Sequence, residues 1–197
     1  MLNFRRSTGA AIETPRLLLR LPQYADHPAW ASLRREDEDF LRPWEPRWAP
    51  DHLSRRSFRD RVYWASRARD EGKALPLFLI RREDARLLGA ITLDNIRHGP
   101  SQSGQVGYWI GRGFTRQGLM REALGAVVAH AFAVLDLGRI EAACLPENLA
   151  SRGLLDRAGF VHEGVARRYL QIDGRWRDHE LYAILRTDRG AEGGGPP

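Results

Sequence analysis

The segment 105–132 constrains the fold most, because it joins a strand, a turn and a helix. An aromatic, β-prone run opens it, and a turn rich in glycine and arginine follows at 112–118. Apolar residues then recur at helical spacing: Leu119, Ala123, Leu124, Val127, Val128, Ala131, Phe132 and Leu135. The free N–H groups and the positive dipole end of such a helix face the turn, where Gly118 permits close approach and Arg116 and Arg121 add charge. The segment therefore predicts a pyrophosphate site.

The glycine spacing excludes two common phosphate-binding loops. A dinucleotide fingerprint needs Gly-x-Gly-x-x-Gly, but Gly111 and Gly113 are followed only by Gly118, two residues too late. A P-loop needs Lys-Ser or Lys-Thr after its last glycine, where this chain has Leu119 and Met120. The turn therefore belongs to neither of these two classes of phosphate-binding loop.

The turn resembles the pyrophosphate loop of the GNAT acetyltransferases, whose pattern is Gln/Arg-x-x-Gly-x-Gly/Ala after the fourth strand. The matching residues are 115–120, with Gly118 at the central glycine position. Thr115 replaces Gln/Arg and Met120 replaces the last small residue, so two positions depart from the pattern. On this stretch alone, a strand-turn-helix joint without a ligand is the alternative interpretation.

The rest of the chain predicts alternating strands and helices. Helical spacing is found at 23–35, from 51 or 54 to 71, at 119–137 with Gly138 as its end, and at 148–157. β-Prone runs occupy 14–21, 75–81, 87–96, 105–111, 139–145, 160–172 and 175–185. Asp173-Gly174 between the last two runs is a hairpin signal. The prolines of 40–46 predict a stiff loop without regular structure.

These elements predict an α+β (α/β) fold with one mixed sheet, and the GNAT resemblance implies a mixed, mostly antiparallel sheet of about seven strands flanked by about four helices. One domain is expected at 14–187, between an N-terminal tail at 1–13 and a disordered, Gly- and Pro-rich C-terminal tail at 188–197. The order of the elements also resembles the GNAT fold over nearly the whole chain.

Four separated segments are similar to the RimJ/RimL branch of that family, the ribosomal-protein-alanine N-acetyltransferases, and closest to RimJ. They are 40–46, 117–120, Asn148 to Ser151 with Gly159-Phe160, and the hairpin 169–179. In that branch Met at position 120 is ordinary. The resemblance implies the GNAT fold and acetyl transfer from acetyl-CoA, as co-substrate, straight to an amine.

The resemblance also implies which residues bind acetyl-CoA. The backbone of Tyr108, Trp109 and Ile110 would pair with the pantetheine arm, and an N–H near Ile110 would polarise the thioester carbonyl. Asn148 caps the helix at 148–157, contacts the arm, or does both. The pyrophosphate would be held by the amides of the loop residues Arg116, Gln117, Gly118, Leu119, Met120 and Arg121.

Catalytic roles are less sharply specified. Ser151 matches a serine placed near the leaving sulfur in some Rim-type enzymes; a helix residue with a local backbone bond is the alternative. Glu45, Glu141 and Asp178 compete as general base, which stays unassigned. Glu45 is preferred for recognising the amine, and a solvated loop charge is the alternative. Trp44, Glu45 and Asp178 are the candidate substrate-binding residues. The histidines lack metal-ligand spacing, so no metal is expected.

Composition bounds the cellular setting. The chain of 197 residues has a net charge of +6 that comes mostly from arginine, which suits an anionic cofactor, a ribosomal neighbourhood or acidic substrates. An arginine-biased proteome is the alternative explanation. Cys144 is the only cysteine, so an intrachain disulfide is excluded. The sequence lacks an apolar run of about 20 residues and an apolar N-terminal leader. A cytoplasmic monomer or homodimer without membrane or direct DNA binding is expected.

The leading hypothesis is acetylation of the N-terminal α-amine, on Ala or Ser, of a protein such as a ribosomal protein. The first alternative is acetylation of a small amine, such as a polyamine, amino acid or antibiotic. The second is a non-catalytic, ribosome-associated factor that binds acetyl-CoA.

Overall fold

The computed structural model describes residues 11–189. The predicted tails, 1–13 and 188–197, lie outside the described residues apart from 11–13 and 188–189. Ile12–Glu13 forms a short strand, so the sheet begins just before the predicted domain start at residue 14. Within 11–189, no helix is long and apolar enough to cross a membrane.

The strands and helices follow the predicted order. The strands are β1 (Ile12–Glu13), β2 (Leu17–Arg20), β3 (Leu75–Arg81), β4 (Leu87–Arg97), β5 (Ser103–Ile110), β6 (Arg139–Cys144), β7 (Val161–Ile172) and β8 (Arg175–Leu185). The α-helices are α1 (His27–Glu36), α2 (Glu38–Leu41), α3 (Arg55–Asp70), α4 (Leu119–Ala133) and α5 (Leu149–Arg157). Short 3-10 turns are η1 (Tyr24–Asp26), η2 (Arg42–Trp44), η3 (Arg112–Phe114) and η4 (Arg186–Arg189).

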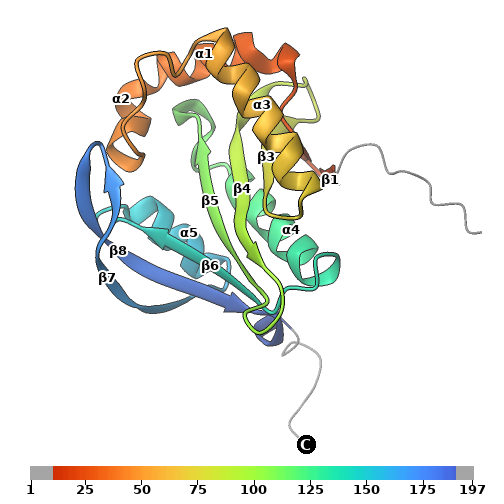
Figure 1. Ribbon diagram of the computed structural model, residues 1–197, viewed down its shortest axis with the longest axis vertical. Helices are drawn as coiled ribbons and strands as arrows, with labels where there is room; N and C mark the ends of the chain where they lie inside the picture. The colour runs from red at the N-terminus through yellow and green to blue at the C-terminus, as the bar shows by residue number, and fades with distance from the viewer. Residues whose placement is uncertain (1–10, 190–197) are drawn as a thin grey trace, which may run out of the picture.

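The described strands form one mixed sheet with the order β1-β2-β3-β4-β5-β6-β8-β7 (Figure 1). β5 and β6 are parallel, and the other neighbours are antiparallel. The predicted mixed, mostly antiparallel α+β architecture is confirmed. The sheet has eight strands rather than about seven because two residues before Thr14 pair with β2.

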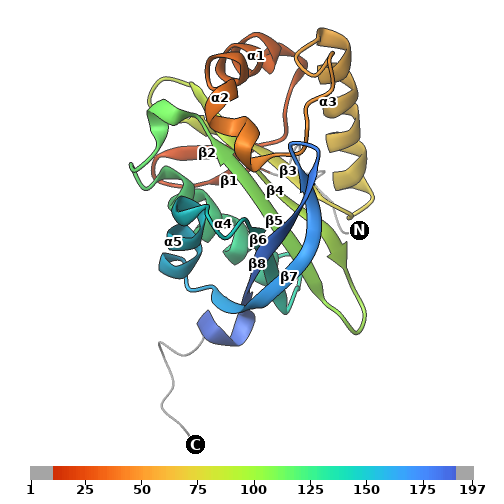
Figure 2. The ribbon, with the colours of Figure 1, turned by 90° about the vertical axis from the view of Figure 1, so that its left-hand side faces the viewer.

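Helices cover both faces of the sheet, with α1 and α3 on one side and α4 and α5 on the other (Figure 2). The larger core lies under α4, where Ala123, Leu124 and Val127 pack on apolar residues of the strands. A second core joins Trp30 of α1 and Phe58 of α3 to β3. Because α4 meets the sheet along most of its length, the loop at its N-terminus has a rigid support.

Two local predictions were wrong. Residues 40–44 are not an irregular loop, because Phe40 and Leu41 end α2 and Arg42–Trp44 form η2. Pro43 lies within the first two positions of η2, where no intrahelical N–H bond is needed. The central helix α4 ends at Ala133 rather than at Gly138.

Candidate active site

The sheet opens between its two parallel strands. β5 and β6 pair from Ser103–Arg139 to Val106–Ala142, and no further pair is recorded within residues 11–189. Beyond this point the two strands diverge (Figure 1). The remaining residues of β5 keep their pairing with β4 as far as Ile110. One edge of β5 is therefore left for another partner, and we call this opening the fork.

The backbone groups at the fork follow from the β4–β5 register. Ile110 lies opposite Gly89, and the Gly111 N–H bonds to the Leu88 carbonyl at 2.9 Å. This makes Ile110–Gly89 a non-hydrogen-bonded pair and places Trp109 in a hydrogen-bonded pair with β4. The N–H and C=O groups of Tyr108 and Ile110 therefore point into the fork. Among the three predicted pantetheine-binding residues, Trp109 is the one whose backbone is engaged with β4.

The predicted phosphate loop has the backbone conformation that its glycine suggests. Arg116 and Gly118 have φ of 59° and 74°, and Gly118 is the N-cap of α4. The first bond of the helix runs from the Glu122 N–H to the Gly118 carbonyl at 3.0 Å. The amides of residues 119–121 consequently have no carbonyl one turn earlier and face the loop. The side chains of Leu119 and Met120 are buried, so these two residues can offer only backbone groups.

The loop is also closed by its own side chains. Thr115 donates from its hydroxyl to the Arg112 carbonyl at 2.9 Å, and Gln117 donates to the Gly113 carbonyl at 3.0 Å. Thr115 and Gln117 thus shape the loop from within. Side-chain identity matters here for conformation, which leaves the amides for an anion.

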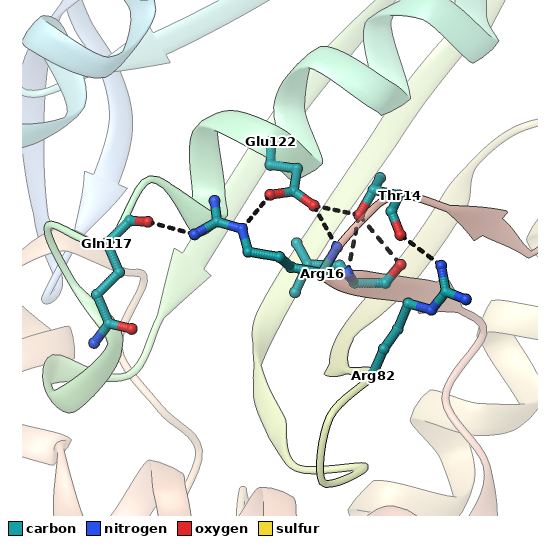
Figure 3. Close-up of polar contacts among 6 residues, drawn as sticks. Thr14, Arg16, Arg82, Gln117 and Glu122 are labelled. Carbon is teal, nitrogen blue, oxygen red and sulfur yellow. Dashed lines mark hydrogen bonds and ion pairs between the residues drawn. The ribbon is translucent and has the colours of Figure 1, made fainter.

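Arg16 braces this loop through hydrogen bonds, a role that no sequence pattern indicated (Figure 3). Its Nη1 donates to the Gln117 carbonyl at 2.9 Å, and its Nε donates to the Glu122 carboxylate at 2.6 Å. Glu122 also accepts from the Thr14 hydroxyl at 2.6 Å. Burial alone would raise the pKa of Glu122, but the bonds from Thr14 and Arg16 outweigh it and hold the pKa below its usual value. The carboxylate therefore stays charged and fixes the first turn of α4.

Ser151 lies on α5, of which Asn148 is the N-cap, across the fork from β5. The Asn148 side chain accepts from the Ser151 N–H at 3.0 Å, which confirms the predicted helix cap. The Ser151 hydroxyl is 2.8 Å from the phenol oxygen of Tyr108. The contact between Tyr108 and Ser151 therefore links α5 to the free edge of β5.

On the opposite face of the sheet, a compact ionic and aromatic cluster packs against Trp109. Arg34 lies over the rings of Trp48 and Trp109, with its guanidinium carbon 4.3 Å and 4.7 Å from their centres. Both its terminal nitrogens donate to Glu45, at 2.8 and 2.5 Å. The Trp48 indole donates to the same carboxylate at 2.8 Å. Glu45 is therefore held inside the protein rather than projecting as a free loop charge.

The front segment and the last hairpin meet beside this cluster. The Asp173 N–H donates to the Glu45 carbonyl at 2.9 Å, and the tip of the β7–β8 hairpin approaches η2 in both ribbon views (Figures 1 and 2). A cavity of about 380 Å³ lies here, between η2, the hairpin and the start of α5. Trp44, Arg175 and Arg177 are among its lining residues. The front segment and the last hairpin thus line one open cavity, and Trp44 is the candidate substrate-binding residue that lies in its wall.

The other base candidates have structural partners. Asp178 accepts from the Arg168 N–H at 2.7 Å, where Arg168 has a φ of 49° and β7 is bulged, and it is outside the cavity lining. Glu141 on β6 pairs with Arg139, whose Nε is 2.8 Å away. Within residues 11–189, no group of three or more potential metal ligands is clustered.

A family of known enzymes matches the part of the chain that forms the fork and the braced loop. Residues 16–161 match the family described as Acetyltransferase (GNAT) domain, and the chain belongs to this family. The match covers α1 to α5 and the whole fork.

The chain is also similar to individual enzymes over most of its length. It is 34% identical over 179 residues to the ribosomal protein uS5-alanine N-acetyltransferase of Escherichia coli (strain K12), covering 90% of this chain and 91% of that protein. The structure of Mycobacterium smegmatis RimJ in complex with CoA-disulfide is 33% identical, with a TM-score of 0.84 over 91% of this chain and 88% of that one. The ribosomal-protein-S5-alanine acetyltransferase of Vibrio fischeri is 27% identical, with a TM-score of 0.84 over 91% and 98% of the two chains.

These findings confirm the GNAT fold and the RimJ/RimL resemblance. The protein is an N-acetyltransferase with acetyl-CoA as its co-substrate. The unpaired edge of β5 and the amides of the braced loop fit this ligand, because an extended amide-bearing arm and a pyrophosphate need these two kinds of donor.

Proposed function

We propose that the enzyme acetylates the N-terminal α-amine of a protein, on Ala or Ser, and that the acceptor is a ribosomal protein. The observation that carries the proposal is the likeness to the E. coli uS5-alanine enzyme, which spans 90% of this chain. The aligned length therefore includes much of the acceptor side as well as the acetyl-CoA loop. The proposed setting is the cytoplasm, where ribosomes and acetyl-CoA are both present.

The acetyl group passes directly to the amine in this proposal. Cys144 is the only thiol of the chain and is buried. Burial raises the pKa of this thiol above its usual value, which disfavours the nucleophilic thiolate. An acyl-enzyme on Cys144 therefore has no support in the chemistry of the site.

The residues around the fork would do three things. Backbone groups of Tyr108 and Ile110 would hold the thioester arm, and the Ile110 N–H would stabilise charge on the carbonyl oxygen. The loop from Arg116 to Arg121 would hold the pyrophosphate. Ser151 would donate a hydrogen bond to the departing sulfur as the C–N bond forms and the C–S bond breaks, and the proton lost by the amine would end on that sulfur.

An α-amine suits a site with little acid–base machinery. Its pKa is near 8, so roughly a tenth is neutral at pH 7, whereas a lysine amine near 10.4 is neutral in under about one part in a thousand. Positioning can then supply much of the rate. In this proposal Trp44 contacts the acceptor, and Glu45 fixes the wall beside it through Arg34. Asp178 contributes by shaping the hairpin.

The test is thiol release from acetyl-CoA with a matched peptide panel. Peptides starting with Ala or Ser should turn over, and the same peptides blocked by an N-terminal acetyl group should not, even with an internal lysine. Polyamines, amino acids and aminoglycosides complete the panel. Turnover of a small amine without turnover of any free N-terminal peptide would contradict the proposal.

A further inference from the structure

The contact between Tyr108 and Ser151 lies at the branching point of the fork. Tyr108 is two residues beyond Val106, where the pairing of β5 with β6 ends. Cys144 is likewise two residues beyond Ala142, so an unbroken ladder would bring Tyr108 and Cys144 opposite each other. The strands part instead, and the Tyr108 side chain reaches α5, where its phenol oxygen is 2.8 Å from the Ser151 hydroxyl.

The Ser151 hydroxyl does not make the capping-box hydrogen bond that is common for a residue in the first turn of a helix. In a capping box, the third helical side chain bonds to the N–H of the cap residue. Here that N–H, on Asn148, already bonds to the Leu145 carbonyl at 2.9 Å. The cap itself is completed by the Ser151 N–H, which donates to Asn148. Within the described residues, the Ser151 hydroxyl contacts Tyr108 and also hydrogen-bonds with the buried Cys144 thiol, whose pKa that bond lowers against the larger effect of burial.

Either hydroxyl can be the donor in this contact. Burial raises the pKa of the Tyr108 phenol above its usual value, an effect larger than the opposing one of the bond to Ser151. The phenol therefore keeps its proton throughout the working pH range and can act as a donor. When Tyr108 donates to the Ser151 oxygen, the proton of Ser151 must point elsewhere. Each hydroxyl also polarises the next one in such a chain, which strengthens the outer donor.

We propose that Tyr108 is a positioning residue. Its phenol does not contact the substrate but orients the Ser151 hydroxyl towards the sulfur of acetyl-CoA. The helix α5 contains no tyrosine, so it supplies no phenol of its own beside Ser151. Tyr108 brings one to α5 from β5. This inference rests on the role of Ser151 in the proposed function, but not on the identity of the acceptor.

The first experiment measures turnover in a double-mutant cycle of Tyr108→Phe and Ser151→Ala. Each single change should lower kcat about tenfold or more, with the KM for acetyl-CoA changed by less than about twofold. The double variant should be no slower than Ser151→Ala, because Tyr108 acts through Ser151. Additive losses, or an unchanged kcat in Tyr108→Phe, would overturn the proposal.

The matched control is Tyr182→Phe. Tyr182 is a buried tyrosine whose hydroxyl accepts from the Nε of Arg152 at 3.4 Å, one residue beyond Ser151. Removal of the Tyr182 hydroxyl should leave kcat unchanged. A fall in kcat equal to that of Tyr108→Phe would show that any missing phenol near α5 disturbs the site, and would overturn the specific role of Tyr108. Thermal unfolding of all variants separates these effects from loss of the fold.

A second experiment needs no acceptor, and so separates this inference from the proposed function. Calorimetry compares CoA with desulfo-CoA between pH 7 and 9, since a thiol with a pKa of about 8.5 becomes a thiolate in this range. The wild-type protein should favour CoA increasingly as the pH rises, because the Ser151 hydroxyl donates to the thiolate. Tyr108→Phe and Ser151→Ala should both lose that increase. An increase retained in Tyr108→Phe would contradict the inference whatever the natural acceptor is.

Discussion

Both oxygens of the Glu45 carboxylate accept hydrogen bonds from Arg34, whose two terminal nitrogens lie 2.8 and 2.5 Å away. Arg34 is 4% exposed, and its guanidinium carbon lies 4.3 Å and 4.7 Å from the ring centres of Trp48 and Trp109. The pair therefore ties α1 to the segment after η2 and to β5. Since the Glu45 carbonyl also accepts from Asp173, the same residue links the front segment to the last hairpin.

Breaking this pair should destabilise the protein. Arg34→Met removes the paired cation from a carboxylate with side-chain exposure of only 18%, so we expect the free energy of unfolding to fall by about 3 kcal/mol. The double variant Arg34→Met/Glu45→Gln should recover part of the loss, because neither charge then remains buried. Denaturant unfolding measures all three values. Equal stability of the wild type and Arg34→Met would contradict the buried-pair interpretation.

Glu45→Gln separates a structural role from a catalytic one. The amide oxygen can still accept from Trp48, but the charge that Arg34 needs is lost. We expect lower stability and a higher KM for the acceptor, with kcat at saturating acceptor within about threefold of the wild type. A fall of about a hundredfold or more in kcat would instead assign general-base chemistry to Glu45.

Gly118 offers a charge-matched pair of variants at the phosphate loop. Its φ is 74°, and an added Cβ would meet only Arg16 at 3.5 Å, so backbone conformation rather than space limits substitution. Asn tolerates this conformation better than most residues, and Asp has nearly the same shape with a negative charge. Gly118→Asp should weaken acetyl-CoA binding at least about tenfold more than Gly118→Asn does. Equal affinities, measured by calorimetry, would place the pyrophosphate elsewhere.

Arg16 should matter for acetyl-CoA binding although it lies behind the loop. Arg16→Met removes the bonds to the Gln117 carbonyl and to Glu122, and the half-exposed position limits the expected loss to about 1 kcal/mol, or about fivefold in affinity. Arg82→Met is the control, because Arg82 donates to the Thr14 carbonyl at 2.9 Å without touching the loop (Figure 3). A larger loss of affinity in Arg82→Met than in Arg16→Met would exclude the bracing role.

His52 should make the protein sensitive to acid. Burial and the charges of Arg34 and Arg61 lower its pKa from 6.5 to about 4, so the folded protein resists protonation that the unfolded chain accepts. Its contribution to stability is therefore fully present above pH 6.5 and is lost as the pH falls through 4. His52→Gln should flatten the dependence of the melting temperature on pH between 7 and 4. An identical acid dependence in both proteins would contradict this assignment.

Local patterns predicted the elements better than the site. β3 was predicted as 75–81 and is observed as Leu75–Arg81, because an apolar run between a glycine-ended helix and a charged turn leaves little choice. Ser54 and Asn148 cap α3 and α5 as their side-chain chemistry suggests. The family resemblance predicted the function. The glycine spacing alone excluded two classes of phosphate-binding loop but did not identify the ligand.

Long-range pairing was hidden from the sequence. The partner of Glu122 is Arg16, 106 positions away, and the partner of the Ser151 hydroxyl is Tyr108, 43 positions away. In an arginine-rich chain, nothing in the local sequence distinguishes Arg16 or Arg34 from arginines that face water. The prolines of 40–46 likewise indicated a loop, whereas a 3-10 turn accepts Pro43 at its start.

Binding of acetyl-CoA at the fork would couple the stability of the fold to the cellular supply of this ligand. A ligand that pairs with Tyr108 and Ile110 would act as an additional strand of the sheet that is not part of the polypeptide and can dissociate. At a free concentration 100 times its dissociation constant, such a ligand adds about 2.7 kcal/mol to the stability of the protein that binds it. Starvation for acetyl-CoA and CoA would therefore withdraw stability as well as substrate, and shorten the lifetime of the enzyme against proteases.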